Sequence, residues 1–142
     1  MSGKFFLDTN ILVYSFDHSA STKQKKAQKL ITDALDTGKG VISSQVVQEF
    51  LNVATKTTGF NTPFKPEDLR MYLQEVLLPL CEVFSNDELF SLALDVKQLL
   101  GASFYDALIV AGALQGQCET LYTEDLQDGR AVLGVTIRNP FG

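Results

Sequence analysis

The sequence predicts an α/β fold, a three-layer α/β/α domain with a central, mainly parallel sheet. Two observations carry this prediction. Short apolar stretches alternate along the chain with longer segments whose apolar residues recur every three or four positions, the spacing of helices that bury one face. Strands that alternate with helices pair in parallel through right-handed crossovers, so helices cover both faces of the sheet.

Each element follows from its own apolar pattern and from the residues that begin or end it. Cap-type residues, glycines and prolines mark the boundaries. The segment 60–66 is rich in turn residues and predicts a connector, and Pro66 opens the helix after it. The expected strands are 4–7, 41–43, 80–84, 120–123 and 135–137, and the expected helices are 11–14, 21–35, 44–58, 66–78, 86–100 and 104–114. The last helix is almost entirely apolar, which predicts a central, buried position.

Length and composition limit the class of protein. A chain of 142 residues that is 45% hydrophobic and 20% charged is expected to form one domain, residues 1–142, that needs no structural metal. The two widely separated cysteines, Cys81 and Cys118, indicate reduced thiols and a cytoplasmic location. The longest apolar stretch, 108–114, is too short to cross a membrane. A net charge of -5 argues against a protein that binds nucleic acid mainly through an overall positive charge.

The most informative feature is where four acidic residues fall. Asp8 ends the first strand, Asp125 follows the strand 120–123, and Glu49 and Asp106 lie in the early turns of two helices. In a parallel sheet the carboxyl ends of the strands share one edge, where ligands of open α/β sheets bind. The four carboxylates are therefore expected to converge there.

Carboxylates gathered in one cleft require a cation. Two unit charges about 4 Å apart repel by roughly 4 kcal/mol at an effective dielectric constant of 20. Mg²⁺ prefers oxygen ligands and is held by a few carboxylates together with substrate phosphates. His18 is the only histidine and there is no cysteine cluster, which excludes a typical zinc site. Such a site hydrolyses phosphodiesters without a side-chain nucleophile, and no glycine-rich phosphate loop of the GxxxxGK[ST] type occurs.

Each acid also has a purely structural interpretation. Ser103 and Asp106 fit the [ST]-x-x-[DE] capping pattern, and Asp8 and Asp125 suit turns or helix starts. Glu49 is harder to explain this way, because Val46 and Val53 flank it on the same helix face. The two roles are compatible, and the four positions together favour a metal cleft.

At these residues the chain resembles the PIN-domain family, from Phe5 to about Pro140. The resemblance is carried by four blocks in the order of the family: a strand that ends in Asp-Thr-Asn, a strand that leads to a helix with an acid, an aromatic-Asp-Ala start of a buried helix, and a Thr-Glu-Asp turn. The blocks are Phe6–Leu12, Ser43–Phe50, Ser103–Ile109 and Thr123–Gly129. The last block is similar to a toxin-like branch, the VapC toxins of bacterial toxin-antitoxin pairs.

This resemblance implies a Mg²⁺- or Mn²⁺-dependent endoribonuclease. It implies Asp8, Glu49, Asp106 and Asp125 as the catalytic, metal-binding acids. Asn10 and Thr123 are implied as polar support. For VapC-like toxins it further implies an RNA substrate, a homodimer and inhibition by a small antitoxin protein. Glu124 and Asp128 leave open which residue fills the fourth acidic role.

Three alternatives remain at this point. One is a PIN nuclease used in RNA processing or acting on DNA, and another is a non-catalytic PIN-like binding module, which the presence of all four acids disfavours. The third is a haloacid-dehalogenase-like phosphotransferase with Asp8 as the nucleophile, but Asn10 stands where that family has a second acid. The lysines on the segment 21–35, namely Lys23, Lys25, Lys26 and Lys29, fit a solvated helix face better than an RNA-binding surface.

Overall fold

The structure, a computed structural model, describes residues 3–56 and 64–142 and has the three-layer α/β/α architecture that the sequence predicts. Its strands are β1 (Phe5–Leu7), β2 (Gly40–Ser43), β3 (Cys81–Val83), β4 (Thr120–Tyr122), β5 (Ala131–Val132) and β6 (Val135–Arg138). Its helices are α1 (Thr9–Tyr14), α2 (Ser21–Thr37), α3 (Ser44–Ala54), α4 (Pro66–Tyr72), the π-helix η1 (Leu73–Leu77), α5 (Leu78–Leu80), α6 (Asp87–Leu100) and α7 (Phe104–Gln115).

The sheet is mainly parallel, as predicted. Over the described residues its strand order is β3-β2-β1-β4-β6-β5, and neighbours run parallel from β3 to β6. The two-residue β5 pairs antiparallel with β6 and was not predicted, because two residues carry no periodic pattern. At the opposite edge, β3 has three residues, and its register against β2 shifts between Ile42 and Ser43. β1 lies inside the sheet between β2 and β4.

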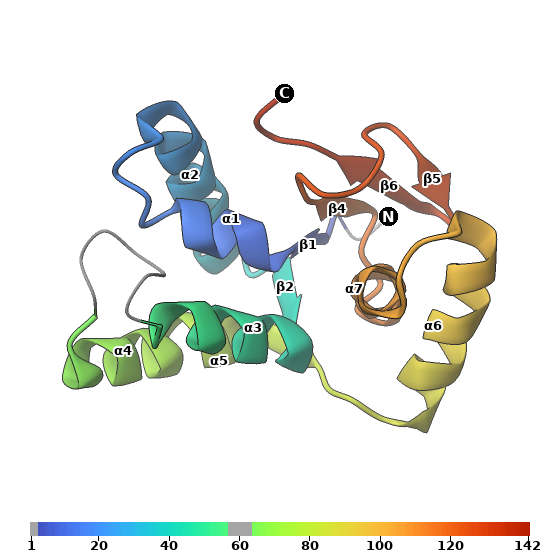
Figure 1. Cartoon of the computed structure of the whole chain (residues 1–142), viewed down its shortest axis with the longest axis horizontal. Helices are drawn as coiled ribbons and strands as arrows, with labels where there is room; N and C mark the ends of the chain where they lie inside the picture. The colour runs from blue at the N-terminus through green and yellow to red at the C-terminus, as the bar shows by residue number, and fades with distance from the viewer. Residues whose placement is uncertain (1–2, 57–63) are drawn as a thin grey trace.

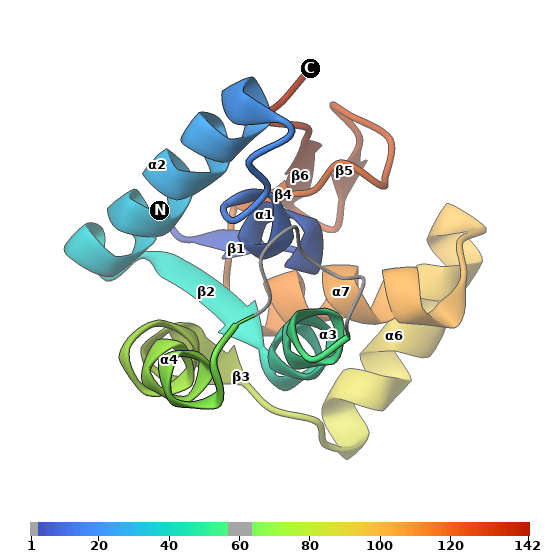
Figure 2. The same ribbon diagram turned by 60° about the vertical axis from the view of Figure 1, so that its left-hand side comes forward.

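Helices cover the two faces of the sheet, with α2 on one side of β1 and β2 and α7 on the other, where α6 packs against it (Figures 1 and 2). Residue alternation along the strands explains this arrangement. Phe6 and Val41 are register partners, and they lie against Gly112 of α7 and Gly116, the residue that caps the end of α7. Gly40, one residue earlier, faces Ala34 of α2 instead.

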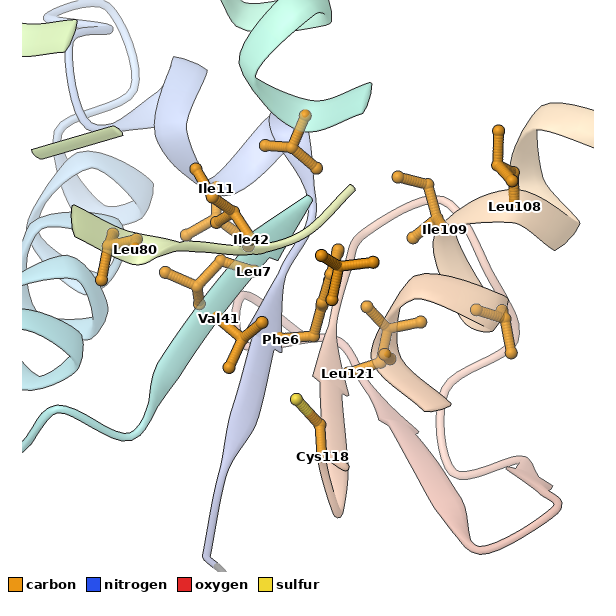
Figure 3. Close-up of a cluster of buried hydrophobic side chains, with 14 of the residues drawn as sticks. Phe6, Leu7, Ile11, Val41, Ile42, Leu80, Leu108, Ile109, Cys118 and Leu121 are labelled. Carbon is orange, nitrogen blue, oxygen red and sulfur yellow. The ribbon is translucent and has the colours of Figure 1, made fainter. Parts of the chain in front are cut away.

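The core lies where β1, β2 and β4 meet these helices, and Figure 3 shows Phe6, Leu7, Val41 and Leu121 within it. In α7, every residue from Ala107 to Ala113 is buried, which confirms the central position predicted for this helix. Among the described residues, no helix has both the length and the apolar character needed to cross a membrane.

The helical segment after Pro66 is longer than predicted. The sequence predicts its end near Leu78, before Pro79, but α4, η1 and α5 continue as far as Leu80. Pro79 cannot donate a backbone hydrogen bond to the preceding turn, and the π-helical turn at η1 changes the bonding pattern just before it. α3 ends at Ala54, and the predicted connector 60–66 lies mostly outside the described residues.

The contact between β2 and α2 leaves no room for a side chain at Gly40. A Cβ placed there would lie 2.0 Å from the Ala34 Cβ and 2.7 Å from the Ala34 Cα, far inside van der Waals contact. We expect Gly40→Ala to lower the free energy of unfolding by about 1–3 kcal/mol through overpacking, measured by denaturant unfolding. Ala34→Gly added to this variant should restore part of the loss, and an unchanged stability of Gly40→Ala would contradict the close packing.

Candidate active site

A cleft of about 640 Å³ opens at the carboxyl edge of the sheet, and all four acidic residues singled out in the sequence line it. Asp8 follows β1, Asp125 follows β4, Glu49 lies on α3, and Asp106 lies in the first turn of α7. α3 begins at this edge because it follows the carboxyl end of β2. α7 precedes β4 and runs antiparallel to it, so its first turn also lies at the carboxyl edge. The other lining residues are Thr9, Asn10, Val13, Tyr14, Asp17, Gln45, Asn52, Val53, Tyr105, Ile109 and Glu124.

Capping residues fix the helix starts around the cleft. The Asp8 side chain accepts from the Thr9 backbone N–H and caps α1. Ser43 caps α3, and the Ser103 hydroxyl accepts from the Asp106 N–H and caps α7. Ser103 thus caps α7, while Asp106 in the first turn of that helix lines the cleft.

Asp8 is the buried acid of the site, with 7% of its surface exposed. Its Oδ1 accepts from the Thr9 N–H at 2.7 Å and its Oδ2 from the Thr123 hydroxyl at 2.8 Å. Burial raises the pKa of the Asp8 carboxyl to about 6, hydrogen bonds from Thr123 and Thr9 oppose this rise, and the nearby Asp125 and Glu49 carboxylates add to it. Burial therefore makes the charged form of Asp8 less favourable than it is in water, and a nearby cation would offset this cost.

Two further hydrogen bonds position the neighbouring carboxylates. The Thr9 hydroxyl donates to Glu49 Oε1 at 2.7 Å. The Asn10 Nδ2 donates to Asp125 Oδ2 at 3.0 Å and to the Thr123 hydroxyl at 3.3 Å. The fully buried Thr123 hydroxyl also accepts from the Asp125 N–H. These bonds hold the ends of β1 and β4 together and aim Glu49 and Asp125 along the cleft.

Glu124, one of the two alternatives for the fourth acid, is bound to cationic and hydroxyl groups. Its carboxylate accepts from the Tyr14 hydroxyl at 2.7 Å and from the Lys23 ammonium at 2.5 Å. The bond to Lys23, followed by that to Tyr14, lowers the pKa of Glu124. The Lys23 Nζ also lies 4.7 Å from the centre of the Tyr14 ring. Glu124 therefore joins the loop after β4 to α1 and α2.

Asp128, the other alternative, is turned toward the C-terminal segment. Its Oδ1 accepts from the Asn139 N–H at 3.0 Å, and it is not one of the residues that line the cleft. Glu124 and Asp128 are therefore each bonded to groups outside the acidic cluster. Asp125 is the acid of this loop whose carboxylate is bonded to Asn10.

The cleft suits a hydrated hard cation better than a fully dehydrated one. Within residues 3–56 and 64–142, no three acidic, histidine or cysteine side chains lie close enough to ligate one ion together. Mg²⁺ usually keeps several waters and takes only one or two carboxylates, so this spacing fits it. The buried oxygens Asn10 Oδ1 and Gln45 Oε1 also line this region and accept no hydrogen bond from the described residues. The lining is therefore rich in acceptors, as a hydrated cation requires.

The structure gives roles at the site to residues for which the sequence predicts none, including Lys23, which the sequence places on a solvated helix face and the structure bonds to Glu124. Thr9 holds Glu49, Tyr14 and Lys23 hold Glu124, and Gln45 lines the cleft. Gln45 was recognisable in principle, because it is a polar residue one turn before Glu49 on a mostly apolar helix. No local pattern marks Tyr14 or Lys23, since their partner is a hundred residues away.

Comparison with known proteins gives a family and a set of structural neighbours. The family model of the PIN domain matches residues 5–127. No curated protein matches the sequence closely enough to count as a relative.

Similar solved structures include a toxin-antitoxin complex from Klebsiella pneumoniae, with 21% identity, a TM-score of 0.67 and coverage of 97% of this chain and 98% of that chain. They also include FitAcB from Neisseria gonorrhoeae (21%, 0.63, 96% and 97%) and DNA-bound VapBC from Salmonella typhimurium (20%, 0.65, 96% and 98%). At these identities the likeness shows a shared fold.

The raised pKa of Asp8 makes the stability of the metal-free protein depend on pH. Because the folded-state pKa, about 6, lies above the ordinary 3.8, this group stabilises the folded state fully below pH 4, and the contribution is lost as the pH rises through 6. We expect Asp8→Asn, which cannot ionise, to gain stability relative to wild type over this window, by about 1–3 kcal/mol at pH 7.5. Urea unfolding in EDTA at several pH values measures this, and a difference that does not change with pH would contradict it.

Proposed function

Because this chain belongs to the PIN-domain family, we propose that it is a nuclease, specifically a metal-dependent endoribonuclease that hydrolyses RNA phosphodiester bonds and acts as the toxin of a toxin-antitoxin pair. One observation carries the proposal. Four acids from widely separated parts of the chain, Asp8, Glu49, Asp106 and Asp125, line a single cleft at the carboxyl edge of a parallel sheet. A purely structural origin would not gather four like charges on one surface, since their repulsion lowers stability.

Mg²⁺ or Mn²⁺ would lie among the four acids, with one or two carboxylates as direct ligands and the others bonded to waters that the ion retains. When bound, such a cation supplies positive charge to the scissile phosphate and lowers the pKa of water. The burial of Asp8 and the raised pKa of its carboxyl support this proposal, because a neighbouring cation would favour the charged form of that buried group.

The polar side chains at the end of β1 prepare the cleft for that ion. Thr9 donates to Glu49, and Asn10 donates to Asp125 and Thr123. Thr123 in turn donates to Asp8. Carboxylates that are already oriented lose less conformational freedom on binding. Asn10 and Thr123 are therefore supporting residues in this proposal.

The acidic net charge is compatible with an RNA substrate if the cation supplies the local positive field. Two of the four α2 lysines already have acidic partners, because Lys23 is bound to Glu124 and Lys29 pairs with Asp33. Lys25 and Lys26 are exposed. RNA binding is thus expected to be modest and to weaken with salt.

The toxin role is supported by the nature of the structural neighbours, which include a toxin-antitoxin complex and a VapBC complex. By analogy we propose a small antitoxin protein as partner and a homodimer as the assembly. The cytoplasm is the proposed location, which agrees with the buried, unpaired thiols of Cys81 and Cys118.

Cleavage of total RNA by the purified, antitoxin-free protein tests the enzymatic part. We expect discrete fragments with Mg²⁺ or Mn²⁺ and none with EDTA. Asp8→Ala and Asp106→Ala should reduce the rate by roughly 100-fold or more, because a catalytic cation contributes several kcal/mol to the transition state. Gel electrophoresis and end-mapping of the fragments provide the measurement.

Asp36→Ala is the matched control, since Asp36 is an exposed acid on α2 outside the cleft. It should cut RNA at the wild-type rate. If the folded wild type cuts DNA but not RNA, the proposed substrate is wrong and DNA takes its place. Equal activity of Asp8→Ala and wild type would exclude this cleft as the active site.

Expression in a bacterial host tests the toxin part. We expect wild type to arrest growth and Asp8→Ala to be tolerated, because only the former can cleave RNA. Co-expression of a small protein encoded next to this gene should relieve the arrest and copurify with the wild-type chain. Growth curves and size-exclusion chromatography check this. Sustained growth with active nuclease in the cell would point to an RNA-processing enzyme instead.

A further inference from the structure

Gln45 is a buried polar residue that lines the cleft beside the acidic residues. It lies on α3, one helical turn before Glu49, and only 8% of its surface is exposed. Its neighbours Val46 and Phe50 on the same helix are apolar and fully buried. A long polar side chain is unfavourable in such surroundings unless its polar atoms have partners.

One end of the Gln45 amide has a clear partner. Its Nε2 donates to the backbone carbonyl of Tyr105 at 3.2 Å. Tyr105 precedes Asp106 in the first turn of α7, so this bond links the two helices that carry Glu49 and Asp106. It also fixes which way the amide is turned, with Oε1 pointing away from the Tyr105 carbonyl.

The other end of the amide is unpartnered. Gln45 Oε1 is buried and accepts no hydrogen bond from the residues that the structure describes. Two side-chain donors of the cleft are already used, because Thr9 donates to Glu49 and Asn10 to Asp125. A buried acceptor without a donor is rare in folded proteins and calls for a ligand or an ordered water.

The chemistry of the cleft limits what that donor can be. The four carboxylates and a substrate phosphate are all acceptors, so none of them can donate to Oε1. Among the groups that could enter the cleft, two hydroxyl donors fit, namely a water that hydrates the cation and the 2′-hydroxyl of a ribose. The position of Gln45, bonded beside Asp106 and one turn from Glu49, favours the water, since Mg²⁺ and similar ions retain several.

We propose that Gln45 is a positioning residue of the metal cleft, whose Oε1 accepts a hydrogen bond from a water that hydrates the divalent cation. Its Nε2, bonded to the Tyr105 carbonyl, keeps this oxygen in place. The proposal rests on the cation requirement of the proposed function. It makes Gln45 a determinant of cation affinity that acts before any RNA is present.

Isothermal titration of RNA-free protein with Mn²⁺ tests this directly. Gln45→Met keeps the length of the side chain and removes both polar atoms, and we expect it to weaken Mn²⁺ binding roughly 10-fold, the lower end of the range for residues that contact metal ligands. Gln48→Met is the matched control, because Gln48 is an exposed glutamine on the same helix. It should bind Mn²⁺ within about twofold of wild type.

Thermal unfolding separates this role from a purely structural one. Without metal, Gln45→Met should melt at a temperature close to that of wild type, because the loss of the Nε2 bond to Tyr105 is offset by removal of an unpartnered buried oxygen. The rise in melting temperature on adding Mn²⁺ should be smaller than in wild type. A lower metal-free melting temperature with a full Mn²⁺ response would overturn the proposal. Gln45→Leu repeats both measurements if the methionine variant does not fold.

The outcomes also distinguish this proposal from the proposed function. Wild type that binds Mn²⁺ but cuts no RNA would end the nuclease proposal while the role of Gln45 still stood. Equal Mn²⁺ affinity of wild type and Gln45→Met, with a raised KM for RNA, would overturn the water contact in favour of the ribose hydroxyl and leave the nuclease intact. Wild type that binds no Mn²⁺ would overturn both.

Discussion

The site depends on the way the chain leaves β1. Three consecutive residues each engage a different carboxylate. Asp8 is itself the buried acid, Thr9 donates to Glu49, and Asn10 donates to Asp125. Because β1 lies inside the sheet, the backbone at this point is held on both sides, and a single turn of chain organises carboxylates contributed by α3 and by the loop after β4.

This arrangement keeps like charges close together. Hydrogen bonds and apolar packing hold the acidic residues in place against their mutual repulsion. Thr123 is fully buried and its hydroxyl accepts from Asn10 and from the Asp125 backbone while it donates to Asp8. The apolar α7 anchors the opposite wall, because its buried length fixes the position of its first turn. The apolar core therefore holds together carboxylates whose mutual repulsion would otherwise move them apart.

The sequence predicts those structural features that depend on residues close together along the chain. The alternation of strands and helices, the buried α7 and the acids at strand ends and helix starts are of this kind, and the structure has these elements and one cleft lined by all four acids. The continuation of the helix past Pro79 and the short β5 depend on tertiary packing. So do the Lys23–Glu124 bond and the bond from Gln45 to the Tyr105 carbonyl, which join residues that no periodic pattern relates.

The two ends of the sheet also limit how this chain can associate with others. β5 contributes two residues and runs antiparallel, and β3 contributes three residues in an irregular register. Edges this short offer few free backbone groups in a row, which discourages strand addition and edge-to-edge aggregation. Contacts with another chain are consequently expected to form through side chains on the helices, so that specificity for a partner resides in residues that can change without altering the sheet.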